Sequence, residues 1–144
     1  MPQALSDIAH VIQLAIAPVF LLTAIGTVLN VLAGRLGRAV DRRRVLVARL
    51  PGLDIEVADL ARAEIAFEVR RIRLVYVAIS MAVLSALLVC ILISLAFIDA
   101  FVSMDLAKLI AALFILAMVA LIACLTVFMR EIFLSVSSPR APVI

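Results

Sequence analysis

The sequence predicts an all-α integral membrane protein with three transmembrane helices, the first two of which extend into a cytoplasmic helical hairpin. Three observations favour this fold class. Of the 144 residues, 67% are hydrophobic, whereas a soluble domain is nearer half apolar. So much apolar surface cannot be buried in one small core, so lipid must cover much of it. The apolar residues also gather in three long runs, and most arginines lie between the first two runs.

The three apolar runs lie at residues 8–33, 74–98 and 106–129. Each is longer than the roughly 20 residues that cross the hydrocarbon core of a bilayer. Backbone groups in lipid need hydrogen-bond partners within the protein, so each run is expected to be a helix. We expect a single membrane domain over residues 1–144, with a frayed C-terminal tail at about 137–144.

The first run is expected to stay in the membrane rather than to be cleaved. A signal peptide has a basic start, and Asp7 is the only side-chain charge before residue 8. Pro18 lies inside the run, where it removes one backbone hydrogen bond and favours a kink. In the alternative, residues 6–17 lie on the membrane surface and Pro18 begins the span. That would leave about 16 apolar residues, which is a short crossing, so the kinked span is preferred.

Residues 34–73 are predicted to form the helical hairpin. No proline interrupts the chain between residue 34 and Pro51, so the first helix can continue to about Leu50. The sequence Pro-Gly-Leu-Asp then breaks the helix, and Asp54 is placed to cap the next one. Apolar residues follow at near-helical spacing, so the second helix should run on into the second span.

The distribution of arginine predicts the orientation. Residues 34–73 hold ten arginines, and Arg130 and Arg140 follow the third run, whereas Lys108 is the only basic residue on the other side. Basic residues stay on the cytoplasmic side of a membrane. We therefore expect a multi-pass protein of the inner (plasma) membrane, with the N-terminus outside and the hairpin and C-terminus in the cytoplasm.

The hairpin arginines are expected to contact anionic lipid head groups rather than nucleic acid. Six acidic residues are interspersed among them and aromatic residues are scarce, unlike a nucleic-acid-binding surface. Arginines next to spans are typical of contacts with anionic lipids on the cytoplasmic side. The residues expected to make these contacts are Arg35, Arg38, Arg70, Arg71 and Arg73.

No catalytic or metal-binding motif is found in the sequence. His10 is the only histidine, and a metal site needs three or four converging ligands. Cys90 and Cys124 are expected at depths that differ by ~15–20 Å, too far apart for a disulfide within one chain. No nucleophile and base stand at matching depth, so an enzyme is the least supported hypothesis. No cofactor is expected.

The first span carries a polar face. Spacings of three and four residues place these side chains on one side of the helix, named the polar face: Gln13, Ile16, Phe20, Thr23, Thr27, Asn30, Gly34, Gly37 and Asp41. Polar groups in a span face protein or water, so this face should point away from lipid. One interpretation is helix packing, because Asn and Thr bond across helices and glycines allow close approach. The other is a pore in an oligomer, lined by Thr23, Thr27 and Asn30. Phe20 or Ile16 would then form a constriction, and Asp41 or Arg38 would set the charge at the inner mouth.

The second span carries a ridge of small residues at every fourth position. The ridge comprises Ala78, Ala82, Ala86, Cys90 and Ser94. Small residues let a neighbouring helix approach closely, so this ridge is interpreted as a packing surface. A short acidic loop joins the second and third spans, so these two helices should pack as an antiparallel pair.

Three stretches of the chain resemble a known family. They are "IAHVIQLAIAPVFLLTAIGTVLNVLAGRLGRAVDRRRVL", "RRIRLVYVAISMAVLSALLVCILISLAFID" and "FMREIFLSV". Together they resemble the bacterial membrane-protein family catalogued as domain of unknown function 2721. The resemblance implies a small three-span bacterial membrane protein, and it implies no established activity and no assigned site residues.

The functional expectation is a self-associating membrane protein without enzymatic activity. Three spans hold too little volume for a pore, so conduction requires a homo-oligomer. The first hypothesis is an oligomeric ion channel or permeation pathway lined by the polar face. The alternative is an accessory or scaffold subunit of a larger membrane complex.

Overall fold

The computed structural model describes residues 2–102 and 105–136, and helices are the only regular elements in this part of the chain. Their order is α1 (Pro2–Arg49), the 3-10 turn η1 (Leu50–Gly52), α2 (Ile55–Val102) and α3 (Ala107–Val136). The three α-helices are each long and apolar enough to cross a membrane. The predicted all-α fold with three candidate spans is therefore confirmed.

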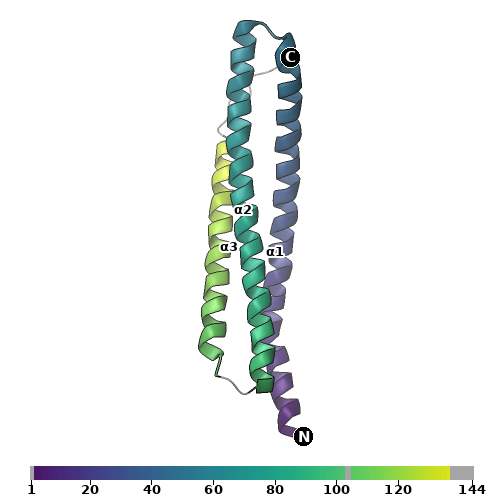
Figure 1. Ribbon diagram of the computed structural model, residues 1–144, viewed down its shortest axis with the longest axis vertical. Helices are drawn as coiled ribbons and strands as arrows, with labels where there is room; N and C mark the ends of the chain where they lie inside the picture. The colour runs from purple at the N-terminus through teal and green to yellow at the C-terminus, as the bar shows by residue number, and fades with distance from the viewer. Residues whose placement is uncertain (1, 103–104, 137–144) are drawn as a thin grey trace.

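The first two helices are much longer than a membrane crossing requires. At about 1.5 Å per residue, the 48 residues of α1 and of α2 each extend about 72 Å. The 30 residues of α3 extend about 45 Å, and a hydrocarbon core is about 30 Å thick. Figure 1 shows the result: α1 and α2 continue side by side past the end of α3 and are joined there by η1.

Pro18 lies inside α1 and is buried. Because α1 is one continuous helix from Pro2 to Arg49, Pro18 does not begin it. The structure therefore favours a single long helix over a separate surface helix at residues 6–17. Proline has no N–H to donate to the carbonyl of Leu14, which makes this turn the predicted weak point of the helix.

The break between α1 and α2 occurs at the predicted sequence. The turn η1 contains Pro51, and the N–H of Leu53 donates to the carbonyl of Leu50 at 3.4 Å. Asp54 directly precedes α2, and its carbonyl accepts a hydrogen bond from the N–H of Ala58 at 2.8 Å. The tail at 137–144, which was expected to fray, lies outside the described residues.

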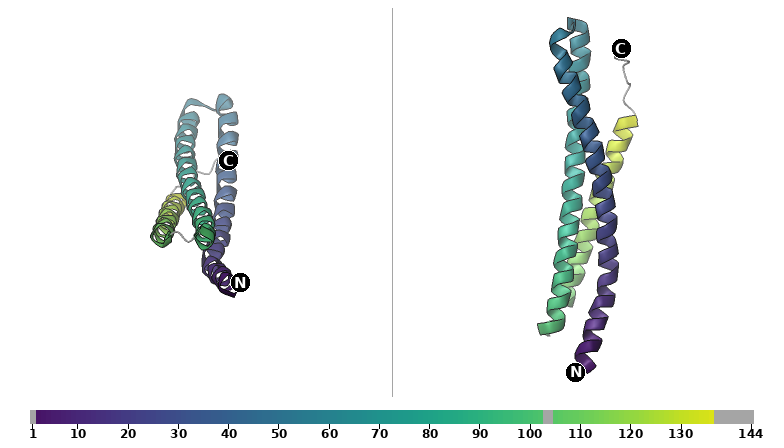
Figure 2. Two further views of the ribbon diagram at one scale, coloured as in Figure 1. Left: turned by 60° about the horizontal axis from the view of Figure 1, so that its bottom comes forward. Right: turned by 90° about the vertical axis from the view of Figure 1, so that its right-hand side faces the viewer.

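The three helices lie nearly parallel to one long axis, with α2 between the other two (Figures 1 and 2). The helix α2 packs along both α1 and α3, whereas α1 and α3 approach each other only sparsely. The predicted antiparallel pairing of the second and third spans is confirmed. Because α2 is covered on two sides, it contributes more buried residues than either neighbour.

Most of the buried residues recur every seven positions, as in a left-handed coiled coil. On α1 they are Pro18, Ile25, Leu32, Ala39 and Leu46. On α2 one row is Ala61, Glu68, Val75, Ala82 and Val89, and a second is Ala78, Ser85 and Leu92. On α3 the row is Ala117, Cys124 and Glu131. The Ser85 hydroxyl donates to the carbonyl of Ala117 at 2.8 Å, so the second row of α2 faces α3.

Candidate functional site

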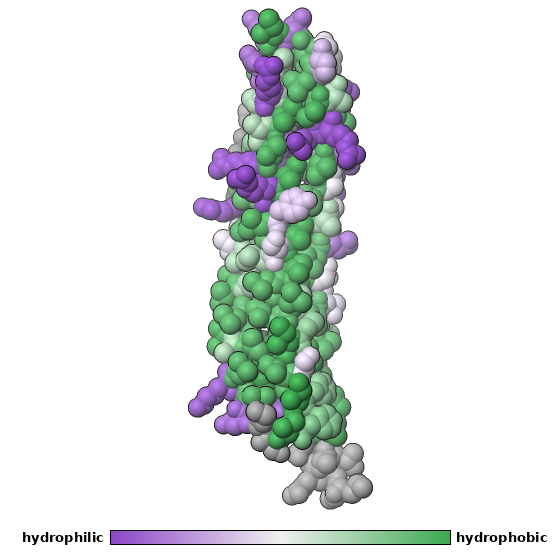
Figure 3. All heavy atoms as spheres, viewed as in Figure 1, coloured by the Kyte–Doolittle hydropathy of each residue, from purple (hydrophilic) through white to green (hydrophobic). Residues whose placement is uncertain are grey.

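A cluster of four charged side chains joins the three helices at one level of the molecule. The boundary cluster consists of Arg35 on α1, Glu68 and Arg71 on α2, and Glu131 on α3. Arg35 and Glu131 each lie two residues beyond an apolar run, and Arg71 lies three residues before one. The cluster therefore lies at one boundary of the apolar region. Figure 3 shows a largely apolar surface below this level and most hydrophilic side chains above it.

Glu131 is the centre of the boundary cluster. Its side chain is 1% exposed. Arg35 Nη1 donates to Oε2 at 2.7 Å, while Arg71 Nη2 and Nε donate to Oε1 at 2.9 Å and 3.2 Å. Both carboxylate oxygens thus accept charged hydrogen bonds, one set from α1 and the other from α2. Glu131 therefore anchors α3 to both other helices.

The remaining contacts complete a continuous chain of ion pairs. Arg71 Nη1 donates to both carboxylate oxygens of Glu68, at 3.1 Å and 3.3 Å. The guanidinium of Arg35 also lies 5.2 Å from the centre of the Phe128 ring, within the range of a cation–π contact. The order is Arg35–Glu131–Arg71–Glu68, so each inner member contacts two opposite charges.

The cluster is balanced because two arginines face two glutamates. A buried charge is costly unless it is paired and its hydrogen-bonding groups are satisfied. Among the described residues, no buried side-chain nitrogen or oxygen lacks a hydrogen-bond partner. The planar guanidinium of Arg71 reaches two carboxylates at once, which the compact ammonium of lysine does not do with the same geometry.

The next layer beyond the boundary cluster contains an ion pair between α1 and α2 alone. Seven residues beyond Arg35 on α1 stands Arg42, and seven residues before Arg71 on α2 stands Glu64. Arg42 Nε donates to Glu64 Oε1 at 3.0 Å. On α2, the cation Arg71 contacts Glu131 in the boundary cluster. Seven residues earlier, the equivalent position is the anion Glu64, which contacts Arg42. The layer of Arg42 and Glu64 is balanced without a contribution from α3.

The polar face of α1 points away from the other two helices. Its nine members are all exposed in the single chain. Thr27 lies about two residues along the helix from buried Ile25, so it is turned by roughly 200° from the side that packs on α2. Packing between the three helices of one chain therefore does not use the polar face.

The threonines and the amides of the polar face differ in their hydrogen bonding. The Thr23 hydroxyl donates to the carbonyl of Val19 at 3.4 Å, and the Thr27 hydroxyl donates to the carbonyl of Thr23 at 3.1 Å. The structure gives the side-chain amides of Gln13 and Asn30 no hydrogen bond to any described residue. The threonine hydroxyls bond to their own helix, and the two amides have no hydrogen-bond partner in the part of the chain that the structure describes.

The small-residue ridge of α2 is divided between the core and the surface. Ala78 and Ala82 are fully buried and Ala86 is half-buried, but Cys90 and Ser94 are exposed. Four residues turn a helix by about 400°, so a row with a spacing of four drifts by about 40° at each step. The buried positions alternate spacings of three and four instead, and after Ala82 they continue with Ser85 and Val89.

The arginines expected to contact lipid also fall into two groups. Arg35 and Arg71 are half-buried and pair with Glu131, so the boundary cluster rather than lipid takes up their charge. Arg38, Arg70 and Arg73 are exposed. Arg130, which was not among the expected contacts, is exposed at the same level on α3.

The remaining candidate groups are dispersed. His10 is exposed, Cys90 is exposed and Cys124 is buried, and both cysteines are free thiols. No group of three or more His, Cys, Asp or Glu side chains that could hold a metal ion occurs within residues 2–102 and 105–136.

Sequence reasoning missed Glu131 and Glu68 as members of a site. Two signals were available for Glu131. It is the only acidic residue after Asp105, and it lies seven residues beyond Cys124 and fourteen beyond Ala117 in the row that α3 buries. Glu68 similarly lies seven residues before Val75. A carboxylate in a buried row at the end of a span predicts a buried ion pair.

The fold and the boundary cluster together define a class: helical proteins with three candidate membrane spans joined at one boundary by buried ion pairs. The model of one family matches residues 15–141, and its description is "Protein of unknown function (DUF2721)". The chain belongs to this family, in agreement with the resemblance of its three stretches. The chain matches no curated protein and no solved structure.

Proposed function

We propose that the chain is a self-associating protein of the bacterial inner membrane, and that its oligomer surrounds a permeation pathway lined by the polar face of α1. The observation that carries this proposal is the exposure of Gln13 and Asn30 within an apolar helix that is long enough to cross a membrane. The polar face offers hydroxyls and amides, which bind ions or water without covalent chemistry. The proposed function is therefore not enzymatic and requires no cofactor.

A single chain in lipid would leave polar groups of α1 without partners. An amide without a hydrogen-bond partner in hydrocarbon costs several kcal/mol. Asn30 is three residues from the end of its apolar run, and Gln13 is five residues from the start, so both lie within the span. A lone chain would expose both amides to lipid, and association of α1 faces removes this cost.

The polar faces of several associated copies would surround a common axis. Thr23, Thr27 and Asn30 are small or polar, so they leave room for water when several copies of α1 share an axis. Phe20 is 71% exposed and provides an apolar constriction on the same side. Asp41 is exposed beyond the span and places negative charge at one mouth. These features favour a pathway for small cations or water.

The proposed orientation in the membrane depends on the position of the arginines. The arginine-rich level of the boundary cluster is the proposed cytoplasmic boundary, because basic residues are retained on that side. The two-helix end formed by residues 34–73 is then a cytoplasmic hairpin, and the N-terminus lies outside. The exposed arginines of this boundary would contact anionic lipid head groups, and nucleic acid is not a proposed partner.

The subunit count tests self-association directly. The intact protein is placed in lipid nanodiscs and its mass is measured by native mass spectrometry. Four or more copies are expected, because one or two copies of α1 cannot enclose an axis. A monomer or a dimer would rule out the central pathway.

Conductance in planar bilayers tests the pathway itself. The substitutions Thr27→Leu and Asn30→Leu place apolar bulk on the polar face, and we expect each to abolish conductance while the subunit count is retained. Val31→Leu is the matched control, because Val31 is exposed on the same helix but outside the polar face. If the wild-type oligomer passes no ions and the two variants release a co-purifying membrane protein, the accessory-subunit alternative replaces the channel.

A further inference from the structure

Two exposed arginines stand directly beside the boundary cluster. Arg70 precedes Arg71 on α2, and Arg130 precedes Glu131 on α3. Both are exposed, and neither forms an ion pair with any described residue. The neighbouring inner charges are already balanced, so no described residue neutralises the positive charge of Arg70 and Arg130.

The contact between Arg71 and Glu131 places the two exposed arginines at the same height. That contact joins Nη2 and Oε1 at 2.9 Å, and Arg70 and Arg130 are each one residue away from it. A step back of one residue turns a helix by about 100°. In two antiparallel helices that face each other, such a step leads to the same side of the pair. Arg70 and Arg130 therefore flank one side of the groove between α2 and α3.

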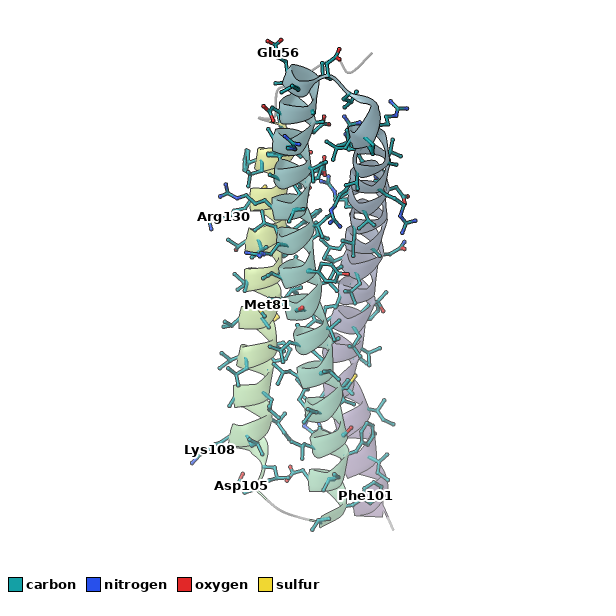
Figure 4. The ribbon with its side chains drawn as sticks, turned by 45° about the horizontal axis from the view of Figure 1, so that its top comes forward. Glu56, Met81, Phe101, Asp105, Lys108 and Arg130 are labelled. Carbon is teal, nitrogen blue, oxygen red and sulfur yellow. The ribbon has the colours of Figure 1, made fainter. Side chains whose placement is uncertain are left out.

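This side of the groove faces away from α1. Arg35 and Phe128 meet on the opposite side of α3, where α1 lies. Figure 4 shows Arg130 directed outward from α3, and Met81 lower down between α2 and α3. Helical spacing places Leu74 and Met81 on the same side of α2 as Arg70, and Val127 and Ala123 on the same side of α3 as Arg130. All four are apolar and half-buried, and the line along which these sides of α2 and α3 meet is called the groove.

We propose that Arg70 and Arg130 bind the phosphate of an anionic phospholipid whose acyl chains lie along the groove of α2 and α3. Guanidinium groups donate paired hydrogen bonds to phosphate oxygens, and two of them at one height match one head group. The apolar groove begins where these arginines end, which is the arrangement of a phospholipid at a membrane boundary. A free phosphate ion would bind the two arginines but would not contact the apolar groove, because it has no acyl chains.

This lipid site does not depend on the proposed pathway. It lies on the side away from α1, and its occupancy needs only insertion of α2 and α3 into a bilayer. Loss of conductance in a variant of the polar face and loss of lipid from a variant of this groove are therefore separate results.

The test measures retained lipid in nanodiscs of phosphatidylcholine with a minor fraction of phosphatidylglycerol. Native mass spectrometry gives the affinity of phosphatidylglycerol for the wild type and for the double variant Arg70→Gln/Arg130→Gln. The expected loss is about fivefold for each arginine and about thirtyfold for the pair. Neither arginine forms an ion pair within residues 2–102 and 105–136, so the variant is expected to fold, and circular dichroism measures its helix content.

The matched control is Arg43→Gln/Arg44→Gln, which removes the same charge from two exposed arginines of α1 that have no ion pair with a described residue and are not among the expected lipid contacts. We expect this control to retain phosphatidylglycerol within about threefold of the wild type. An equal loss in both double variants would show diffuse attraction to the membrane and would overturn the site. Binding of inorganic phosphate in pure phosphatidylcholine nanodiscs, with the same dependence on Arg70 and Arg130, would also overturn the lipid assignment.

Discussion

At the scale of single residues, Glu131 connects all three helices. It accepts hydrogen bonds from Arg35 and Arg71 and is the only contribution of α3 to the boundary cluster. Because α1 and α3 otherwise approach sparsely, the pair Arg35–Glu131 is their main polar contact. A paired buried charge adds little net stability, yet removing one partner leaves uncompensated charge. The cluster therefore specifies how the helices align more than it strengthens them.

Replacement of this carboxylate is predicted to be costly. Glu131→Gln leaves two arginines against Glu68 alone, and we expect the free energy of unfolding to fall by about 3 kcal/mol. The comparison variant is Glu64→Gln, whose partner Arg42 has a side chain that is 52% exposed, and its expected cost is below about 1 kcal/mol. Thermal unfolding in detergent micelles, followed by circular dichroism, measures both. Equal losses would contradict a special role for Glu131.

At the scale of the element, α2 is the helix that determines the packing. It carries two buried rows, one toward α1 and one toward α3, so small residues on it control both interfaces. Ala78 and Ala82 are fully buried, and the Ser85 hydroxyl bonds across to α3. The row that stays buried follows the alternating three-and-four spacing of a coiled coil, while Cys90 turns outward.

A larger side chain on α2 is predicted to lower the free energy of unfolding more at a buried position than at an exposed one. Ala82→Leu forces extra volume between α2 and its neighbours, at an expected cost of about 1–3 kcal/mol in the free energy of unfolding. Cys90→Leu adds similar volume to an exposed position of the same helix and should change stability by less than about 0.5 kcal/mol. The unfolding midpoint in detergent checks both. A larger effect at Cys90 would indicate that this side is covered in the native assembly.

At the scale of the whole molecule, the length of α1 and α2 separates two environments. Below the boundary cluster the surface is largely apolar, and most hydrophilic side chains lie at the level of the cluster and in the two-helix end beyond it (Figure 3). The layer of Arg42 and Glu64 is balanced without α3. The two-helix end is thus suited to water, and the three-helix part is suited to lipid.

The proposed orientation predicts opposite accessibility for the two ends. In a background in which Cys90 and Cys124 are alanine, Gly52→Cys places a thiol at the tip of the two-helix end, where an added Cβ meets nothing within 4 Å. We expect an impermeant maleimide to label it only after the cells are permeabilised, and to label an exposed Ala107→Cys in intact spheroplasts. Labelling of the Gly52 position in intact spheroplasts would reverse the orientation.

Most of the fold could be predicted from local signals in the chain. Three apolar runs predicted three helices, the segment around Pro51 and Gly52 predicted the break, and the short loop before α3 predicted the antiparallel pair with α2. These features depend on the composition and length of short segments, which a single sequence displays directly. The polar face was also visible, because residues three or four apart share one side of a helix.

Which sides of the helices meet could be read from the packed structure but not from the separate segments. The tertiary structure turned the polar face of α1 outward, retained Ala78 and Ala82 in the core while exposing Ser94, and brought Arg35, Arg71 and Glu131 together across sequence separations of up to 96 residues. The physical reason is that helical periodicity defines the faces of each helix separately. Their pairing depends on the register and rotation of α2 between its neighbours, and packing of the buried rows together with the balance of buried charge selects that arrangement.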